Sequence, residues 1–135
     1  MKIVSACLCG MNCMWSGKNK LNPEILEMVK NGHAIPVCPE QMGGLMTPRP
    51  PCEQQKDGRV ISNTGEDRTK EFGKGAQETL NLAIAVGADE FIGKAKSPSC
   101  GVGMVYDGTF SGTLISGNGV TAELFIKNNI KVRSI

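Results

Sequence analysis

The chain is poor in aromatic residues and in histidine. Of its 135 residues, four are Phe, one is Tyr, one is Trp and one is His. A hydrophobic fraction of 40% must therefore build an aliphatic core of Ile, Leu, Val, Ala and Met, and this length suits a single domain over residues 1–135. His33 follows a predicted helix stop, so a histidine-based catalytic site has no support.

A strong excess of charge is also missing. Fifteen Lys and Arg residues against thirteen Asp and Glu residues leave a net charge of +2. The basic residues are scattered along the chain and form no stripe. We therefore expect no bulk nucleic-acid binding.

The sequence shows no export signal and no membrane-spanning segment. Residues 4–7 imitate the cleavage site of a bacterial lipoprotein, but only six residues precede Cys7. A signal needs an apolar region of roughly 7–15 residues behind a charged start. We therefore expect a cytoplasmic protein without membrane contact, in which thiols stay reduced and clustered cysteines more often bind metal or carry chemistry.

What is present is an alternation of short strands and helices. Apolar patterns predict strands at residues 2–6, 34–37, 90–96 and 130–135, with helices at 23–30, at 69–86 and from 120 to about 128. Residues 103–106 and 109–114 flank Asp107 and Gly108, which are expected to form a tight hairpin turn or a loop bend. This order predicts an α/β protein, a single-domain three-layer Rossmann-like fold with a mainly parallel sheet.

The stretch from residue 38 to residue 65 is predicted to lack regular structure. Four of the seven prolines and an adjacent pair of glycines fall between Cys38 and Cys52. A long irregular connection is usually functional or disordered, and its position directly after a strand end favours function.

Three of the six cysteines follow predicted strands. Cys7 and Cys38 come directly after the first two strands, and Cys100 lies shortly after the third. The carboxyl ends of parallel strands share one edge of the sheet, where open α/β folds place their ligands. Thiolates there suit a metal or an iron–sulfur cluster, and three ligands leave one position open for chemistry.

The other cysteines are less clearly assigned. The loop that holds Cys7, Cys9 and Cys13 imitates part of an iron–sulfur or zinc spacing but does not complete one, because the chain contains no CxxC. Cys9 is therefore an alternative to Cys7 as a ligand. Cys52, in a proline-rich polar loop, is interpreted as incidental.

Several polar residues lie beside these cysteines in the sequence. Glu40, two residues after Cys38, suits a proton donor or shuttle if it lies near thiolates and an apolar wall; the alternative is a solvated glutamate. Ser97 and Ser99 could position a water or a substrate atom, or could cap a turn. Arg49 could clamp an anion or carbonyl, or be an ordinary surface arginine.

Motifs at residues 4–7, 37–40, 43–45, 48–49, 97–101, 106–112 and 119–122 recur in this order in one bacterial family. The chain resembles that family over nearly its whole length. The family was long known only as a domain of unknown function, and it includes the 2-thiouracil desulfidases.

The resemblance implies a [4Fe-4S] cluster held by Cys7, Cys38 and Cys100, with one iron free to bind the sulfur of a substrate. It implies catalytic roles for Glu40 and Ser97, and we assign substrate binding to Arg49 and Ser99. The implied enzyme is a desulfidase that removes sulfur from a thiolated nucleobase similar to 2-thiouracil, or a related thioamide, without net redox change. Water replaces the sulfur, which leaves as sulfide.

The first loop departs from the family pattern. The family commonly has Leu where Cys9 stands, and a different sequence at residues 14–17, in the loop expected to shape the substrate pocket. Two other functions stay open: a metal or sulfur carrier that binds a cluster or zinc without turnover, and a thiol–disulfide protein that uses the loop of Cys7, Cys9 and Cys13.

Overall fold

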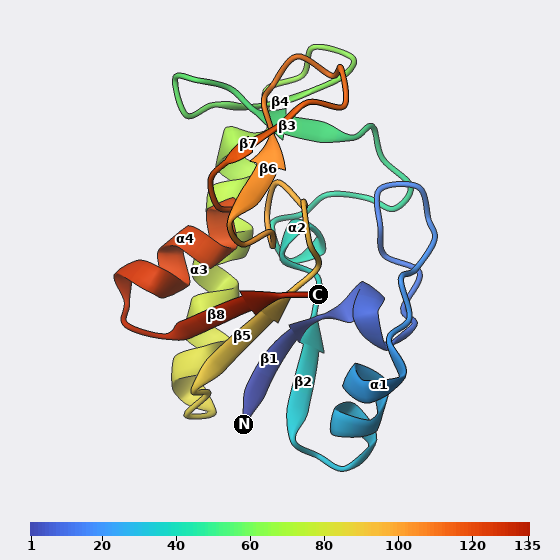
Figure 1. Ribbon diagram of the computed structural model, residues 1–135, viewed down its shortest axis with the longest axis vertical. Coiled ribbons are helices and arrows are strands. Elements are labelled where there is room, and N and C mark those ends of the chain that lie inside the picture. Colours follow the sequence, from blue (N-terminus) through green and yellow to red (C-terminus); the bar gives the residue numbers. More distant parts are fainter.

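A sheet of four parallel strands forms the centre of the computed structural model, which describes residues 1–135. The strands lie in the order β2 (Ala34–Val37), β1 (Lys2–Ser5), β5 (Glu90–Gly93) and β8 (Lys131–Ser134). All three pairings are parallel. Their carboxyl ends therefore meet at one edge of the sheet (Figure 1).

Helices cover both faces of this sheet. Helix α1 (Pro23–Lys30) lies on one face, and α3 (Thr69–Ala85) and α4 (Val120–Lys127) lie on the other (Figure 1). The predicted three-layer α/β class with a mainly parallel sheet is confirmed. None of the helices combines the length and the apolar character that a membrane span requires.

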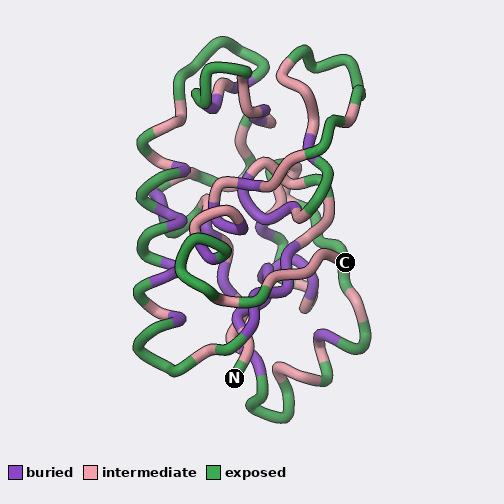
Figure 2. Tube along the Cα trace, turned by 60° about the vertical axis from the view of Figure 1, so that its left-hand side comes forward, coloured by how far each residue is buried: buried purple, intermediate pink, exposed green.

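Each face of the sheet has its own core, because successive strand residues point to opposite faces. On the side of α3 and α4, Ile3 and Phe91 belong to a cluster with Phe125. On the side of α1, Val4 and Ile92 belong to a cluster with Ile25. Buried residues accordingly follow the strands and the inner faces of the helices, while exposed residues lie along the outside (Figure 2).

The capping signals explain why α1 begins where it does. The Asn22 side chain accepts hydrogen bonds from the amides of Glu24 (3.0 Å) and Ile25 (3.2 Å), and Pro23 occupies the first turn. The predicted helix at residues 23–30 is confirmed, and the second predicted helix agrees with α3 to within one residue.

Short elements surround the carboxyl edge of the sheet. The 3-10 helix η1 (Ala6–Cys9) follows β1, and the single-turn helix α2 (Pro39–Met42) follows β2. Two antiparallel hairpins lie beyond this edge (Figure 1). One pairs β3 (Cys52–Gln54) with β4 (Val60–Ser62), and the other pairs β6 (Met104–Tyr106) with β7 (Leu114–Ser116).

The prediction that residues 38–65 lack regular structure is wrong, because α2, β3 and β4 lie within them. A one-turn helix and three-residue strands are too short to produce a periodic pattern. The third strand ends at Gly93 and not at residue 96. The amide of Lys94 donates to the Ser5 hydroxyl at 3.0 Å, so the chain leaves the sheet there.

Of the two alternatives at Asp107 and Gly108, the structure has the loop and not the tight hairpin turn. Strand β6 forms as expected, but its partner begins at Leu114, so residues 107–113 make a longer loop and not a tight turn at Gly108. Local hydrogen bonds stabilise this loop. The Asp107 carboxylate accepts bonds from both the amide (2.9 Å) and the hydroxyl (2.6 Å) of Thr109.

Two glycines allow α2 to lie against α3. A Cβ atom at Gly43 would overlap the carbonyl oxygen of Glu71, and one at Gly75 would overlap the carbonyl oxygen of Pro39. Backbone therefore packs on backbone at this point. This contact fixes the position of α2 relative to α3, and therefore the positions of Cys38 and Glu40.

Gly75→Ala is expected to reduce the free energy of unfolding by about 1–3 kcal/mol, because the methyl group has no space beside Pro39. Gly73, two residues earlier in α3, is exposed, and a methyl group added there would meet no other atom within 4 Å. Gly73→Ala is therefore the matched control, and should stabilise α3 by roughly 0.5–1 kcal/mol. Urea unfolding measures both, and equal effects of the two changes would contradict the proposed close contact.

Candidate active site

A cavity of about 300 Å³ lies at the carboxyl edge of the sheet. Its walls come from the ends of β1 and β2, from the loop at residues 10–20, and from residues 49–53 and 94–100. Five of the six cysteines line it: Cys7, Cys13, Cys38, Cys52 and Cys100.

The three predicted ligand cysteines reach this cavity from three different strands. Cys7 lies in η1 just beyond β1, and Cys38 is the N-cap of α2 just beyond β2. Cys100 arrives through the segment that follows β5. All three line the same cavity, as the strand-end argument requires.

Cys9 lies outside the cavity. Its thiol donates to the carbonyl oxygen of Ala6 at 3.2 Å, within η1. The structure therefore does not bring Cys9 to the other sulfurs, and the alternative of Cys9 in place of Cys7 has no structural support.

Cys13 is a residue that the sequence analysis missed as part of this group. It lines the same cavity as Cys7 and Cys38, and the Cys38 thiol donates to its carbonyl oxygen at 3.7 Å. The loop that carries it folds back on η1, where the amide of Lys20 donates to the carbonyl of Cys7 at 2.9 Å. This closure depends on backbone contacts that spacing alone does not reveal.

The local environment raises the pKa of the Cys13, Cys38 and Cys100 thiols. Burial raises the pKa of Cys100 to about 12. Contact with the Cys13 thiol, followed by burial, raises the pKa of Cys38 far above its ordinary value. Contact with Cys38 lowers the pKa of Cys13, but contact with Cys7 and burial outweigh it and raise that pKa to about 11. A cation bound to the sulfurs would displace these protons.

The arrangement of donors fits a cluster better than a single ion. No three His, Cys, Asp or Glu side chains come together as one metal ion requires. Zinc needs every sulfur at about 2.3 Å from one centre. An iron–sulfur cluster gives each thiolate its own iron, so it suits sulfurs distributed around a cavity that contains no histidine.

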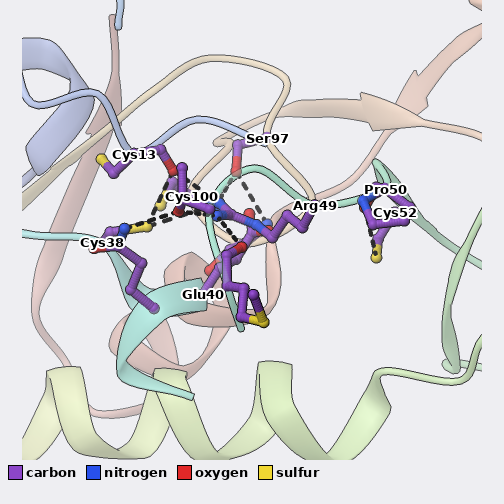
Figure 3. Close-up of polar contacts among 12 residues, drawn as sticks. Cys13, Cys38, Glu40, Arg49, Pro50, Cys52, Ser97 and Cys100 are labelled. Carbon is purple, nitrogen blue, oxygen red and sulfur yellow. Dashed lines mark hydrogen bonds and ion pairs between the residues drawn. The ribbon is translucent and has the colours of Figure 1, made fainter. Parts of the chain in front are cut away.

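Glu40 and Arg49 form a buried ion pair beside Cys38 (Figure 3). The Arg49 Nε donates to Glu40 Oε1 at 3.0 Å, and the side chains of Arg49 and Glu40 are only 6% and 15% exposed, respectively. Burial acts to lower the pKa of Arg49, but the carboxylate of Glu40 outweighs it and raises that pKa. Both residues line the cavity. Glu40 is therefore not a solvated glutamate, and Arg49 is not an ordinary surface arginine.

Ser97 and Ser99 have different surroundings. Ser97 lines the cavity, and its hydroxyl oxygen accepts the amides of Ser99 (3.1 Å) and Cys100 (3.0 Å). Ser99 is 1% exposed, and its hydroxyl bonds that of Thr121 in α4 at 2.8 Å. The structure thus brings Ser97 to the cavity but turns Ser99 into the core.

Other residues also form the wall. Trp15, in the loop that the sequence analysis expected to shape the pocket, lines the cavity, as do Tyr106 and Glu53 in β3, to which the sequence analysis gave no role. Glu53 Oε1 accepts the amides of Gly108 (3.0 Å) and Phe110 (3.1 Å). Glu53 therefore holds the loop at residues 107–113, a role set by contacts more than fifty residues away along the chain.

Comparison with known proteins gives consistent matches. A family model described as 2-thiouracil desulfurase matches residues 3–135. The chain is 38% identical to YbbK of Bacillus subtilis (strain 168), described as an uncharacterized protein, over 143 residues that cover 99% of this chain and 95% of YbbK. It is similar to the solved structure of TudS, a [4Fe-4S]-dependent thiouracil desulfidase, with a TM-score of 0.92 and 40% identity over 98% of this chain and 88% of that one.

Glu53→Ala is expected to free the loop at residues 107–113, because two amides lose their only carboxylate acceptor. Amide hydrogen exchange at Gly108 and Phe110 should become about tenfold faster or more. Glu66→Ala is the control, since Glu66 is exposed and bonds its neighbours Thr64 and Arg68. Unchanged exchange at both amides in the Glu53 variant would show that other contacts hold the loop.

Proposed function

The chain belongs to the 2-thiouracil desulfurase family, and on this premise we propose that it is an iron–sulfur-dependent desulfidase for a thiolated nucleobase similar to 2-thiouracil, or for a related thioamide. The reaction replaces the sulfur by the oxygen of one water and releases sulfide without net redox change. The observation that carries this proposal is the meeting of three cysteines from three strands in one cavity with a buried carboxylate.

We assign Cys7, Cys38 and Cys100 as the ligands of a [4Fe-4S] cluster. Three ligands for four irons leave one iron position open. When bound, such a cluster would supply a thiophilic iron for the soft thiocarbonyl sulfur. The reduced thiols that this requires suit a cytoplasmic location.

Glu40 is the proposed acid–base residue. Its Oε1 is held by Arg49, so Oε2 is available to a water in the cavity. The carboxylate can take a proton from the water as the water oxygen bonds the ring carbon, and can give that proton to the sulfur as the carbon–sulfur bond breaks. The second water proton leaves the oxygen as the ring carbonyl forms, so that one water is consumed and one hydrogen sulfide is released.

Ser97 is proposed to position the substrate. Its oxygen already accepts two amide hydrogens, so its own proton remains to be donated. The carbonyl oxygen of a base similar to 2-thiouracil is a suitable acceptor. The flat side chains of Trp15 and Tyr106 in the same wall suit a planar heterocycle, because aromatic faces stack on bases.

One observation favours a second function. Cys7, Cys13 and Cys38 line the same cavity, and the Cys38 thiol donates to the Cys13 carbonyl oxygen at 3.7 Å; a thiol–disulfide protein also needs cysteines this close together. A protein that stays metal-free after anaerobic reconstitution, and whose Cys13 and Cys38 then form a disulfide with oxidised glutathione that dithiothreitol reverses, would favour this function over the desulfidase.

Protein reconstituted anaerobically with iron and sulfide is expected to release sulfide from 2-thiouracil, measured by methylene blue formation. Cys100→Ser should lose most of the bound iron, because it removes one of three ligands. Cys9→Ser is the matched control outside the cavity, and should keep both iron and activity. A Cys100→Ser protein with full iron content would disprove the assignment of Cys100 as a ligand. The iron content of Cys13→Ser tests whether Cys13 also binds the cluster.

Glu40→Gln is expected to keep its iron but to lower kcat by roughly 10²–10⁴-fold, the usual range for loss of a positioned acid–base group. Glu66→Gln serves as the control, because Glu66 is also paired with an arginine but is 47% exposed and does not line the cavity. Unchanged turnover of the Glu40 variant at full iron content would remove Glu40 from the mechanism.

A further inference from the structure

Every N–H group of the Arg49 guanidinium already has an acceptor in the protein. Its Nε donates to Glu40 Oε1 at 3.0 Å. Its Nη1 donates to the Met46 carbonyl (3.2 Å) and the Thr47 hydroxyl (2.8 Å). Its Nη2 donates to the Cys13 carbonyl (2.9 Å) and the Cys38 sulfur (3.9 Å). Since arginine has five N–H donors, none is left for a substrate.

The burial of Arg49 makes this arrangement costly to disturb. The side chain is 6% exposed, and a buried guanidinium must keep both its hydrogen bonds and its counter-charge. Glu40 supplies the charge. A substrate that took over one of these donors would leave a protein acceptor unpaired, which argues against the substrate-binding role predicted from the sequence.

The acceptors of Arg49 belong to segments that are far apart in the chain. Cys38 and Glu40 flank the start of α2, while Cys13 lies in the loop at residues 10–20. The backbone amide of Arg49 also donates to the carbonyl of Trp15 at 2.8 Å. One residue thus joins that loop to α2 at the cavity wall (Figure 3).

We infer that Arg49 is a positioning residue, which aims Glu40, donates a hydrogen bond to the sulfur of Cys38 and holds the loop at residues 10–20 against the cavity. This inference rests on the function proposed above. It replaces the role of Arg49 as a substrate ligand.

Two properties follow for a protein that contains the cluster. A charged N–H group beside the Cys38 sulfur stabilises added negative charge, and hydrogen bonds to sulfur raise the reduction potential of iron–sulfur clusters. The bond to Oε1 fixes the direction of the Glu40 carboxylate, so its loss slows turnover. Neither effect requires contact between Arg49 and the substrate.

The test compares Arg49→Gln and Arg49→Lys with the wild type. Both changes should lower kcat by about tenfold or more while KM stays within about twofold, the pattern of a lost transition-state interaction. The reduction potential, measured by dye-mediated titration with EPR detection, should shift to a more negative value in Arg49→Gln. Arg49→Lys keeps a positive charge, and should recover part of that shift.

A second readout uses metal-free protein and needs no activity. Trp15 is the only tryptophan in the chain, so its fluorescence anisotropy reports on the loop at residues 10–20. Anisotropy should fall in both Arg49 variants. Arg59→Gln is the matched control, because Arg59 pairs with Asp57 on the surface, where both side chains are more than half exposed; it should change none of these quantities.

The competing outcomes are distinct. A rise of tenfold or more in KM with unchanged kcat would mean that Arg49 binds substrate, and would overturn the inference; so would wild-type values of kcat, potential and anisotropy. If Arg49→Gln fails to fold, Arg49→Lys decides. If the wild type releases no sulfide, the proposed function fails, but the potential and the anisotropy still test the role of Arg49.

Discussion

Parallel pairing of β1 with both of its neighbours is the constraint on which the site depends. Its register places Ser5 opposite Val37 and Val4 opposite Ile92, so three strands end at nearly the same height. The chain then turns away at η1, at α2 and at the segment after β5. Cys7, Cys38 and Cys100 are distant in sequence but lie together, because the three parallel strands that precede them all end at the same edge of the sheet.

Polar contacts hold two parts of the wall around these thiols in place. A buried ion pair between Glu40 and Arg49 joins α2 to the neighbouring loops, and Glu53 holds the loop at residues 107–113. Charges with little access to water are stable only where each has its partners. The wall is therefore pre-organised, and the apolar cores on the two faces of the sheet supply the stability that supports it.

The sequence was informative where a signal is local or periodic. Helix α1 carries a side-chain cap, both α1 and α3 carry apolar stripes, and the strand-end rule located Cys7, Cys38 and Cys100. The sequence was uninformative where contacts between residues distant in the chain determine the position of a side chain. Ser99 turns inward because its hydroxyl bonds that of Thr121, 22 residues later, and Cys13 joins the other sulfurs only because its loop folds back on η1. Elements of three or four residues, such as α2 and β3, are set by their neighbours and have no periodicity of their own.

The loop at residues 10–20 belongs to none of the layers of the fold. It is fastened at its ends by backbone bonds from Lys20 to Cys7 and from Asn22 to Leu8, and at its middle by Arg49. Such an attachment separates the scaffold from the cavity-facing surface that Trp15 presents. Ligand selectivity can therefore change through replacement of this loop alone. A different loop that kept the same anchoring hydrogen bonds would form a different wall over the same cavity.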